Sequence, residues 1–158
     1  MSFKNILVPY DFEKVSDNAL DNAMRIVQLV EDSRITIFHV IPDIMIPISY
    51  SRPVHSFKTG EVIPLSVYVK ELYHEMRLEA LKKLQNKKQK CEKVGILCEN
   101  KIVHGNPQDQ ILKYIKEEKI DLVVIGTTRR KGISKIMTIG SVARNVSERS
   151  SCPVMLVH

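Results

Sequence analysis

Short apolar runs alternate along this chain with longer segments whose apolar residues recur every three or four positions. The first pattern is typical of buried strands and the second of amphipathic helices packed against a sheet. Strands are expected at residues 6–8, 35–41, 96–103, 122–125 and 154–157. Helices are expected to begin near Ser16, Ser66, Asn106 and Ser141. Such an alternation of strand and helix predicts a mostly parallel sheet with helices on both faces.

Two of the helix starts carry capping chemistry. Ser16 is a candidate N-cap, because a serine hydroxyl accepts a hydrogen bond from an unpaired amide of the first turn. Asn106 is a second candidate, and Pro107 after it suits the first helical position, where no amide donor is needed. The strand at 96–103 is interrupted by polar residues, which predicts an edge position in the sheet.

Residues 42–64 interrupt the alternation, and we interpret them as an insertion into a single domain that spans residues 1–158. The insertion contains Pro42, Pro47, Pro53 and Pro64. Proline lacks an amide donor, so neither a continuous helix nor a central strand is expected there. Its apolar residues include Ile44, Met45, Ile46, Ile48 and Tyr50. A loop this apolar is expected to pack on a protein partner, on a second copy, or over a ligand as a lid.

Composition is that of an ordinary globular protein, with 44% hydrophobic and 27% charged residues. The net charge of +6 raises the question of nucleic acid. The densest run of lysines, between Lys82 and Lys93, falls on one expected helix and has no aromatic residues interleaved with it. We interpret this run as a solvated helix face, with a partner surface as the alternative, and expect no nucleic-acid binding.

The three cysteines, Cys91, Cys98 and Cys152, lack the spacing of a metal site. An odd, scattered set is typical of free thiols in a reducing compartment. The chain starts almost directly with a strand-like segment, and it contains no apolar run approaching the roughly 18 residues of a membrane span. We therefore expect a cytoplasmic protein that does not cross a membrane.

The residues best suited to chemistry follow the expected strands at their carboxyl ends. In open parallel sheets, ligands bind beyond these ends, where the strand order reverses. If the strand order is 3-2-1-4-5, the loop Pro9-Tyr10-Asp11 after the first strand faces the loop that begins at Gly126. Asp11 would then accept hydrogen bonds from ribose hydroxyls or help to hold a metal, and Val40 would contact a base.

The last expected helix opens at Gly140-Ser141-Val142. Amides without a partner and the positive end of the helix dipole make such a start attractive to phosphate. Together with the two loops, this feature favours a nucleotide ligand. Each part also has a plain structural explanation: Asp11 would cap a turn, Gly126 would form a tight turn, and Ser141 would simply start a helix.

Seven segments in a fixed order carry a family pattern. They are Ile6-Leu7-Val8-Pro9 with Asp11, Ser16 with Ala19-Leu20, His39-Val40, Gly105 with Pro107, residues 121–126, Gly140-Ser141-Val142, and Cys152-Pro153-Val154. In this set the chain resembles the universal stress protein family over nearly its whole length, the insertion apart. The resemblance implies an α/β fold with an open five-stranded parallel sheet, Rossmann-like and similar to the adenine nucleotide alpha hydrolases.

The resemblance also implies a homodimer, often formed through the final strand. That strand, from Val154 to Val157, would leave an exposed apolar edge if it stayed unpaired. An antiparallel pairing between two copies would cover it.

One branch of the family binds ATP through a motif of glycine, two residues, glycine, nine residues, glycine and then serine or threonine. Gly126 matches the first glycine and Gly140-Ser141 the last pair. The middle glycine does not match, because Arg129 or Arg130 stands there and Gly132 is the nearest glycine. An arginine would obstruct the approach of backbone amides to phosphate, replace them with a charge-assisted hydrogen bond, or lie in a solvated loop tip.

The resemblance implies ATP or AMP as the ligand, with any Mg²⁺ or Mn²⁺ held through the phosphates. The expected site residues are Pro9, Tyr10, Asp11, Val40, Ile125, Gly126, Thr127, Arg130, Gly132, Gly140, Ser141 and Val142. His39 and His104 are expected to have structural roles in a strand and a loop.

Sequence motifs for catalysis are missing. The sequence has no P-loop, no dinucleotide fingerprint, no nucleophile elbow and no zinc-ligand spacing, so at most slow ATP hydrolysis is expected. The expected role is regulatory or in a stress response. The alternative hypothesis is a nucleotide-free interaction module that acts through protein partners. A phosphoacceptor receiver domain is disfavoured, because Asp11 has no partner aspartate after the third expected strand.

Overall fold

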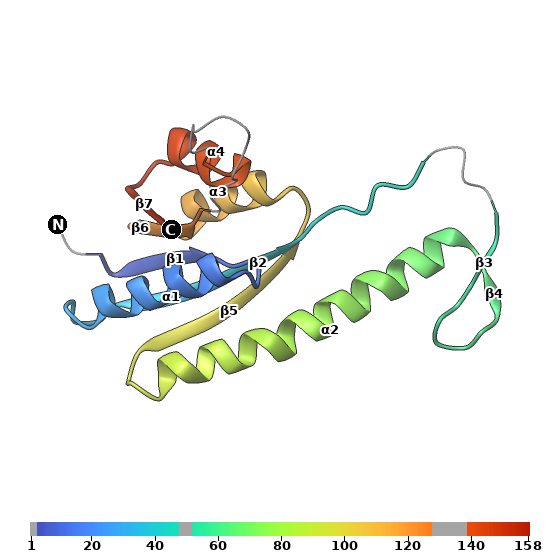
Figure 1. The fold of residues 1–158 in the computed structure, drawn as a ribbon, viewed down its shortest axis with the longest axis horizontal. Coiled ribbons are helices and arrows are strands. Elements are labelled where there is room, and N and C mark those ends of the chain that lie inside the picture. Colours follow the sequence, from blue (N-terminus) through green and yellow to red (C-terminus); the bar gives the residue numbers. More distant parts are fainter. Residues whose placement is uncertain (1–2, 48–51, 128–138) are drawn as a thin grey trace.

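The computed structural model describes residues 3–47, 52–127 and 139–158. Its elements follow the predicted alternation of strand and helix, with one additional hairpin (Figure 1). In chain order they are β1 (Asn5–Pro9), α1 (Lys14–Val27), β2 (Arg34–Ile41), β3 (Val54–His55), β4 (Val62–Ile63), α2 (Leu65–Glu92), β5 (Leu97–His104), α3 (Pro107–Glu117), β6 (Leu122–Gly126), α4 (Ser141–Arg149) and β7 (Val154–Val157).

The central sheet is parallel and has the order β5-β2-β1-β6-β7. Counted among these five strands alone, the order is 3-2-1-4-5, so the predicted fold class and topology are confirmed. β1 occupies the centre, where Ile6 is level with Ile35 of β2 on one side and with Leu122 of β6 on the other. β5 lies at one edge, as its polar interruptions predicted, and β7 lies at the other.

Helices cover both faces of the sheet and bury two apolar layers (Figure 1). α1 and α2 lie on one face, where Leu20 of α1 shares a buried cluster with Ile6. α3 and α4 lie on the other face, where Ile111 and Val146 share a cluster with Leu7. Because β1 is buried on both faces, its residues form a continuous apolar run instead of an alternating pattern.

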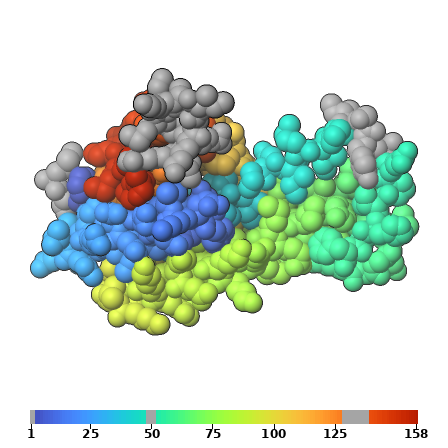
Figure 2. Space-filling model, in the orientation of Figure 1, coloured from blue at the N-terminus to red at the C-terminus, as the bar shows by residue number. Residues whose placement is uncertain are grey.

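Residues 52–79 form an arm that projects from this body (Figures 1 and 2). The arm comprises the antiparallel β3–β4 hairpin and the first half of α2. The sequence did not predict the hairpin, which tolerates the prolines because neither of its two-residue strands is a central strand. The fully buried residues of α2 all lie in its second half: Ala80, Leu84 and Cys91. The body therefore anchors α2 mainly through its second half, whereas Tyr73, Met76 and Arg77 make partly buried contacts with it. Two apolar residues of the insertion, Ile48 and Tyr50, lie outside the described residues.

The two predicted helix caps have different outcomes. Asn106 is the N-cap of α3, where its side chain accepts a hydrogen bond from the Asp109 amide at 3.3 Å and Pro107 follows, as predicted. The prediction for Ser16 is wrong. α1 begins at Lys14 after Glu13, which provides no side-chain cap, and Ser16 lies within the first turn. Its hydroxyl bonds to the preceding loop instead, which competes with capping.

Two further expectations concern thiols and membranes. Cys91, Cys98 and Cys152 are free thiols, with Cys91 buried and the other two partly buried. Within residues 3–47, 52–127 and 139–158, no helix combines the length and the apolar character that a membrane crossing requires.

Candidate functional site

A hollow of about 440 Å³ lies beyond the carboxyl ends of β1, β2 and β6, a size in the usual range for small-molecule sites. β1 pairs with β2 on one side and with β6 on the other, so the hollow lies where the strand order reverses. Nine of the twelve predicted site residues line it: Pro9, Tyr10, Asp11, Val40, Ile125, Gly126, Gly140, Ser141 and Val142. The topology therefore brings together residues that are far apart in the sequence.

The other three predicted site residues are Thr127, Arg130 and Gly132. Arg130 and Gly132 lie outside the described residues, so the substitution of the middle glycine has no structural account here. Thr127 is 2% exposed and faces the chain end instead of the hollow. Its amide donates to the Val157 carbonyl at 2.7 Å, and its hydroxyl lies 2.6 Å from Nδ1 of His158. Thr127 thus joins the end of β6 to the end of β7.

Gly126 permits close contact between β6 and α1. A β-carbon at this position would lie 2.5 Å from the Val15 carbonyl oxygen and 2.6 Å from its carbon, closer than real β-carbons approach. The neighbour is backbone in the first turn of α1, which cannot rotate away as a side chain would. Packing beside the hollow therefore requires a glycine at this position. The sequence predicted a tight turn or the close approach of a ligand, but it did not predict this packing role.

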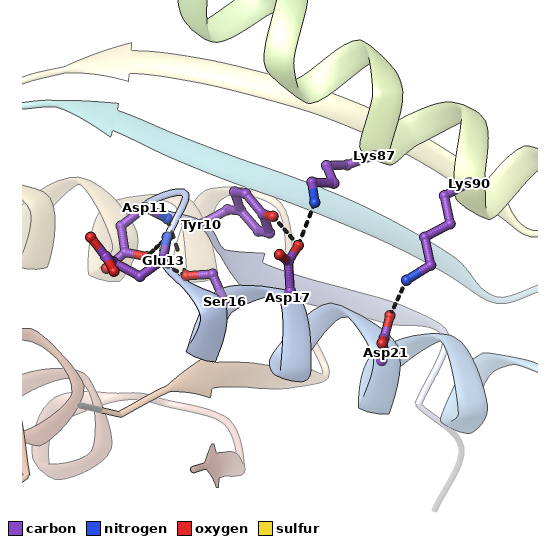
Figure 3. A network of polar contacts seen from close by, with 8 residues as sticks. All are labelled: Tyr10, Asp11, Glu13, Ser16, Asp17, Asp21, Lys87 and Lys90. Atoms are coloured by element: carbon purple, nitrogen blue, oxygen red, sulfur yellow. Dashed lines mark hydrogen bonds and ion pairs between the residues drawn. The ribbon is translucent and has the colours of Figure 1, made fainter. Parts of the chain in front are cut away.

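Asp11 shapes the loop after β1 as well as lining the hollow (Figure 3). Its Oδ1 accepts hydrogen bonds from the Glu13 amide at 3.0 Å and from the Ser16 hydroxyl. The Asp11 amide in turn donates to the Ser16 hydroxyl oxygen at 3.2 Å. Through these contacts Asp11 caps the turn, as one of the predicted alternatives stated. Asp11 is also exposed, so it remains accessible from the hollow.

The backbone of Tyr10 is held by β2, one of the two strands beside β1. Its amide donates to the Phe38 carbonyl at 2.8 Å, and its own carbonyl lies 2.7 Å from Nδ1 of His39. Because a carbonyl oxygen only accepts, Nδ1 must be the protonated nitrogen of His39. His39 thus has the expected structural role. It also lines the hollow, which its position beside Val40 could have suggested.

The hydroxyl of Tyr10 reaches α1, where it donates to Oδ1 of Asp17 (Figure 3). Burial raises the pKa of Tyr10, and the hydrogen bond and negative charge of Asp17 raise it further. Burial alone would also raise the pKa of Asp17, but hydrogen bonds from Lys87 and Tyr10 and the nearby lysine charges hold that pKa below its usual value. At neutral pH the pair is therefore a neutral phenol that donates to a carboxylate.

The start of α4 supplies amide donors to the hollow. Gly140 occupies the N-cap position and provides no side-chain cap, and Ser141 is the first helical residue. Ser141 is thus not the cap itself. Within the part of the chain that the structure describes, no N-cap side chain accepts from the first amides of α4, so these amides and the helix dipole favour an anion at this end.

A second hollow of about 440 Å³ adjoins the first at Gly140 and Ser141 and runs along α4. Arg144 and Glu148 of α4 line it, with Gln108 of α3. Arg144 was not among the predicted site residues, because no motif marks it. Arg144 lies about one turn after the start of α4, and it adds positive charge to this hollow.

The site offers little for a metal ion. Among the residues that the structure describes, no three His, Cys, Asp or Glu side chains are grouped as metal ligands. Asp11 is the carboxylate that lines the main hollow, and its Oδ1 is already used within the loop. The described residues therefore do not fit a metal ion held by the protein.

The comparisons with known proteins agree with this arrangement. A sequence model of the universal stress protein family matches residues 2–158. The chain belongs to this family. Universal stress protein YxiE of Bacillus subtilis (strain 168) is 31% identical over 155 residues, which are 98% of this chain and 99% of that protein. Universal stress protein UspA from Lactobacillus plantarum has a TM-score of 0.78 at 22% identity, covering 100% of this chain and 99% of that chain.

Two further universal stress proteins of similar fold were crystallised with nucleotides. One is in complex with cAMP and has a TM-score of 0.63 at 21% identity, covering 100% of this chain and 98% of that chain. The other, from Arabidopsis thaliana, has AMP bound and a TM-score of 0.64 at 18% identity, covering 98% of this chain and 90% of that chain. At these identities the likeness concerns the fold, and the ligands are those of the two neighbours.

Proposed function

We propose that this universal stress protein binds an adenine nucleotide, ATP or AMP, in the hollow beyond β1, β2 and β6, and that it acts in regulation or a stress response. The observation that carries the proposal is the convergence of nine sequence-predicted residues on one hollow at the switch point of the sheet. The nucleotide complexes of two neighbours with this fold support it.

The lining divides into parts that suit the parts of a nucleotide. Val40, with Ile111 of α3, provides apolar contact for a base. Asp11 lies in the loop between β1 and α1, where its carboxylate would accept hydrogen bonds from ribose hydroxyls. The first amides of α4 and the Ser141 hydroxyl would donate to phosphate oxygens. Any Mg²⁺ or Mn²⁺ would be bound through those phosphates, and no catalytic step is assigned to the described residues.

The first test is whether protein purified from cells and then denatured releases an adenine nucleotide that mass spectrometry detects. Isothermal titration with ATP, ADP and AMP then gives the affinities. Heat with at least one of them is expected. A protein that releases no nucleotide and gives no heat at millimolar ligand would contradict the proposal and favour the nucleotide-free interaction module, for which the exposed Met45 of the insertion is suited.

A charge variant tests where the phosphates bind. Ser141→Asp places a carboxylate in the first turn of α4, where it favours the helix dipole but repels phosphate. We expect about tenfold weaker ATP binding or more, with no loss of thermal stability. Ser66→Asp is the matched control, because Ser66 is exposed in the first turn of α2, far from the hollow. Equal affinities for the two variants would place the phosphates elsewhere.

We also propose a homodimer through β7. β7 is an edge strand whose Met155 is 40% exposed, so a second copy would cover an unpaired edge. Met155→Lys should convert dimer to monomer in light scattering, whereas Leu97→Lys on the opposite edge strand should not. A parent protein that is monomeric at micromolar concentration would contradict this.

A further inference from the structure

Lys87 of α2, Asp17 of α1 and Tyr10 of the loop after β1 meet at a single carboxylate oxygen (Figure 3). The Lys87 ammonium lies 2.6 Å from Oδ1 of Asp17, and the Tyr10 hydroxyl donates to the same oxygen. The chain of contacts therefore runs from the anchored half of α2 to the floor of the candidate nucleotide site. Neither Lys87 nor Asp17 lines the hollow itself.

Tyr10 is the middle residue of the three-residue segment that lines the hollow after β1. Pro9, Tyr10 and Asp11 all line the hollow, and Tyr10 is 4% exposed. Its backbone bonds fix the loop to β2, whereas its hydroxyl fixes the loop to α1 and, through Asp17, to α2. Loss of the second attachment would remove the link through Asp17 to α2 and leave the bonds between Asp11 and Ser16 as the link to α1.

The loop also contains a conformation that needs support. Phe12 has φ +69°, in the left-handed region that residues with a β-carbon adopt only at a cost in free energy. α2 covers this residue as well, because the Lys83 ammonium lies 5.3 Å from the centre of the Phe12 ring. Lys87 lies 5.8 Å from the centre of the Tyr10 ring. Two neighbouring lysines of α2 therefore contact two aromatic residues of one strained loop.

We propose that Lys87, Asp17 and Tyr10 are positioning residues, through which α2 holds the loop after β1 in the shape that the nucleotide site requires. The part of this inference that concerns the nucleotide rests on the proposed function. The conformation of the loop itself is measurable without a nucleotide.

The molecule contains a matched comparison. Lys90 of α2 and Asp21 of α1 form an ion pair of 2.5 Å about one turn further along the same two helices. Both pairs join α2 to α1 near the surface, but Tyr10 donates to Asp17 and not to Asp21. Lys87→Met and Lys90→Met therefore remove similar contacts between the two helices. Only Lys87→Met removes a contact to the carboxylate that Tyr10 also binds.

The experiment measures two quantities on the parent chain and on Lys87→Met, Lys87→Arg, Lys90→Met and Tyr10→Phe. The first is the amide resonances of Asp11, Phe12 and Glu13 without ligand, and the second is the ATP affinity by titration. Lys87→Met and Tyr10→Phe should shift these resonances and weaken ATP binding by about five- to tenfold, the scale of losing one ordinary hydrogen bond. Lys87→Arg should restore both, and Lys90→Met should leave both unchanged.

Equal effects of Lys87→Met and Lys90→Met on the loop resonances would overturn the inference, because the lysines would then serve only to join the helices. Loop shifts without any change in the affinity of a parent that binds ATP would also overturn it. If the parent binds no nucleotide, the proposed function fails, and the loop resonances alone decide whether Lys87 positions the loop.

Discussion

Gly126 at the end of β6 lies so close to Val15 of α1 that a β-carbon on the glycine would stand 2.5 Å from the Val15 carbonyl oxygen. The first turn of α1 can therefore sit against the sheet beside the candidate site, and the loop after β1 runs past the same point. A glycine of the nucleotide motif is thus explained by packing, whether or not a ligand is present.

Gly126→Ala tests this packing. Because the opposing atoms are backbone, the chain must shift, and the free energy of unfolding should fall by about 2–3 kcal/mol, the range of an overpacked interior. Gly60→Ala is the comparison, since nothing lies within 4 Å of its added β-carbon and only its φ of +75° opposes the substitution, at about 1 kcal/mol. Urea unfolding of both variants measures the difference. A Gly126→Ala chain at least as stable as Gly60→Ala would contradict the packing account.

Leucines of α2 test how the arm is attached. Leu84 is fully buried against the sheet, whereas Leu78, six residues earlier, is 48% exposed on the arm. Leu84→Ala should lower the free energy of unfolding by about 2–4 kcal/mol, and Leu78→Ala should change it by about 0.5 kcal/mol or less. Denaturant titrations of the two variants check this. Similar losses at both positions would mean that the arm is packed on something in solution.

The ion pair at Asp17 gives a pH dependence. Hydrogen bonds from Lys87 and Tyr10 outweigh burial and lower the pKa of Asp17 in the folded chain, so the unfolded chain binds the proton more tightly. The stabilisation is therefore present above the unfolded pKa of about 3.9 and is lost as pH falls through the folded value. Asp17→Asn should be less stable than the parent near neutral pH, and the gap should close in acid. A gap that persists in acid would show that the effect is not ionic.

The start of α3 gives a test of capping. Asn106 accepts a hydrogen bond from the Asp109 amide, whereas Glu13 occupies the same position before α1 without a side-chain bond. Asn106→Ala should lower the free energy of unfolding by about 1 kcal/mol, and Glu13→Ala by about 0.5 kcal/mol or less. Thermal unfolding distinguishes the two. Equal losses would argue against the cap.

Much of the fold was predictable because strands and helices leave periodic patterns. The run from Leu122 to Ile125 predicted a buried strand and Asn106-Pro107 predicted a helix start, and both predictions are confirmed. For the strand order 3-2-1-4-5, the rule for parallel sheets placed Asp11 opposite Gly140-Ser141, and in the structure these residues line one hollow.

The remaining features depend on contacts between distant residues. Lys87 is 70 residues from Asp17, and no periodicity links a lysine in a basic run to one carboxylate. Thr127 follows Gly126 directly, yet its side chain faces His158 and not the hollow. Serine is a residue type that favours the N-cap position, but the Ser16 hydroxyl bonds to Asp11 because Asp11 lies beside it in the loop before α1. These hydrogen-bond partners are set by which residues lie close together in the folded chain, and the local sequence pattern does not reveal that.

The most direct measurement of the central claim is a titration of the isotopically labelled chain with ATP, followed by its amide resonances. The account predicts saturable shifts concentrated at Ser141 and Val142 of α4 and at Asp11 in the loop after β1. No saturable shifts, or shifts confined to the arm at residues 52–79, would contradict it.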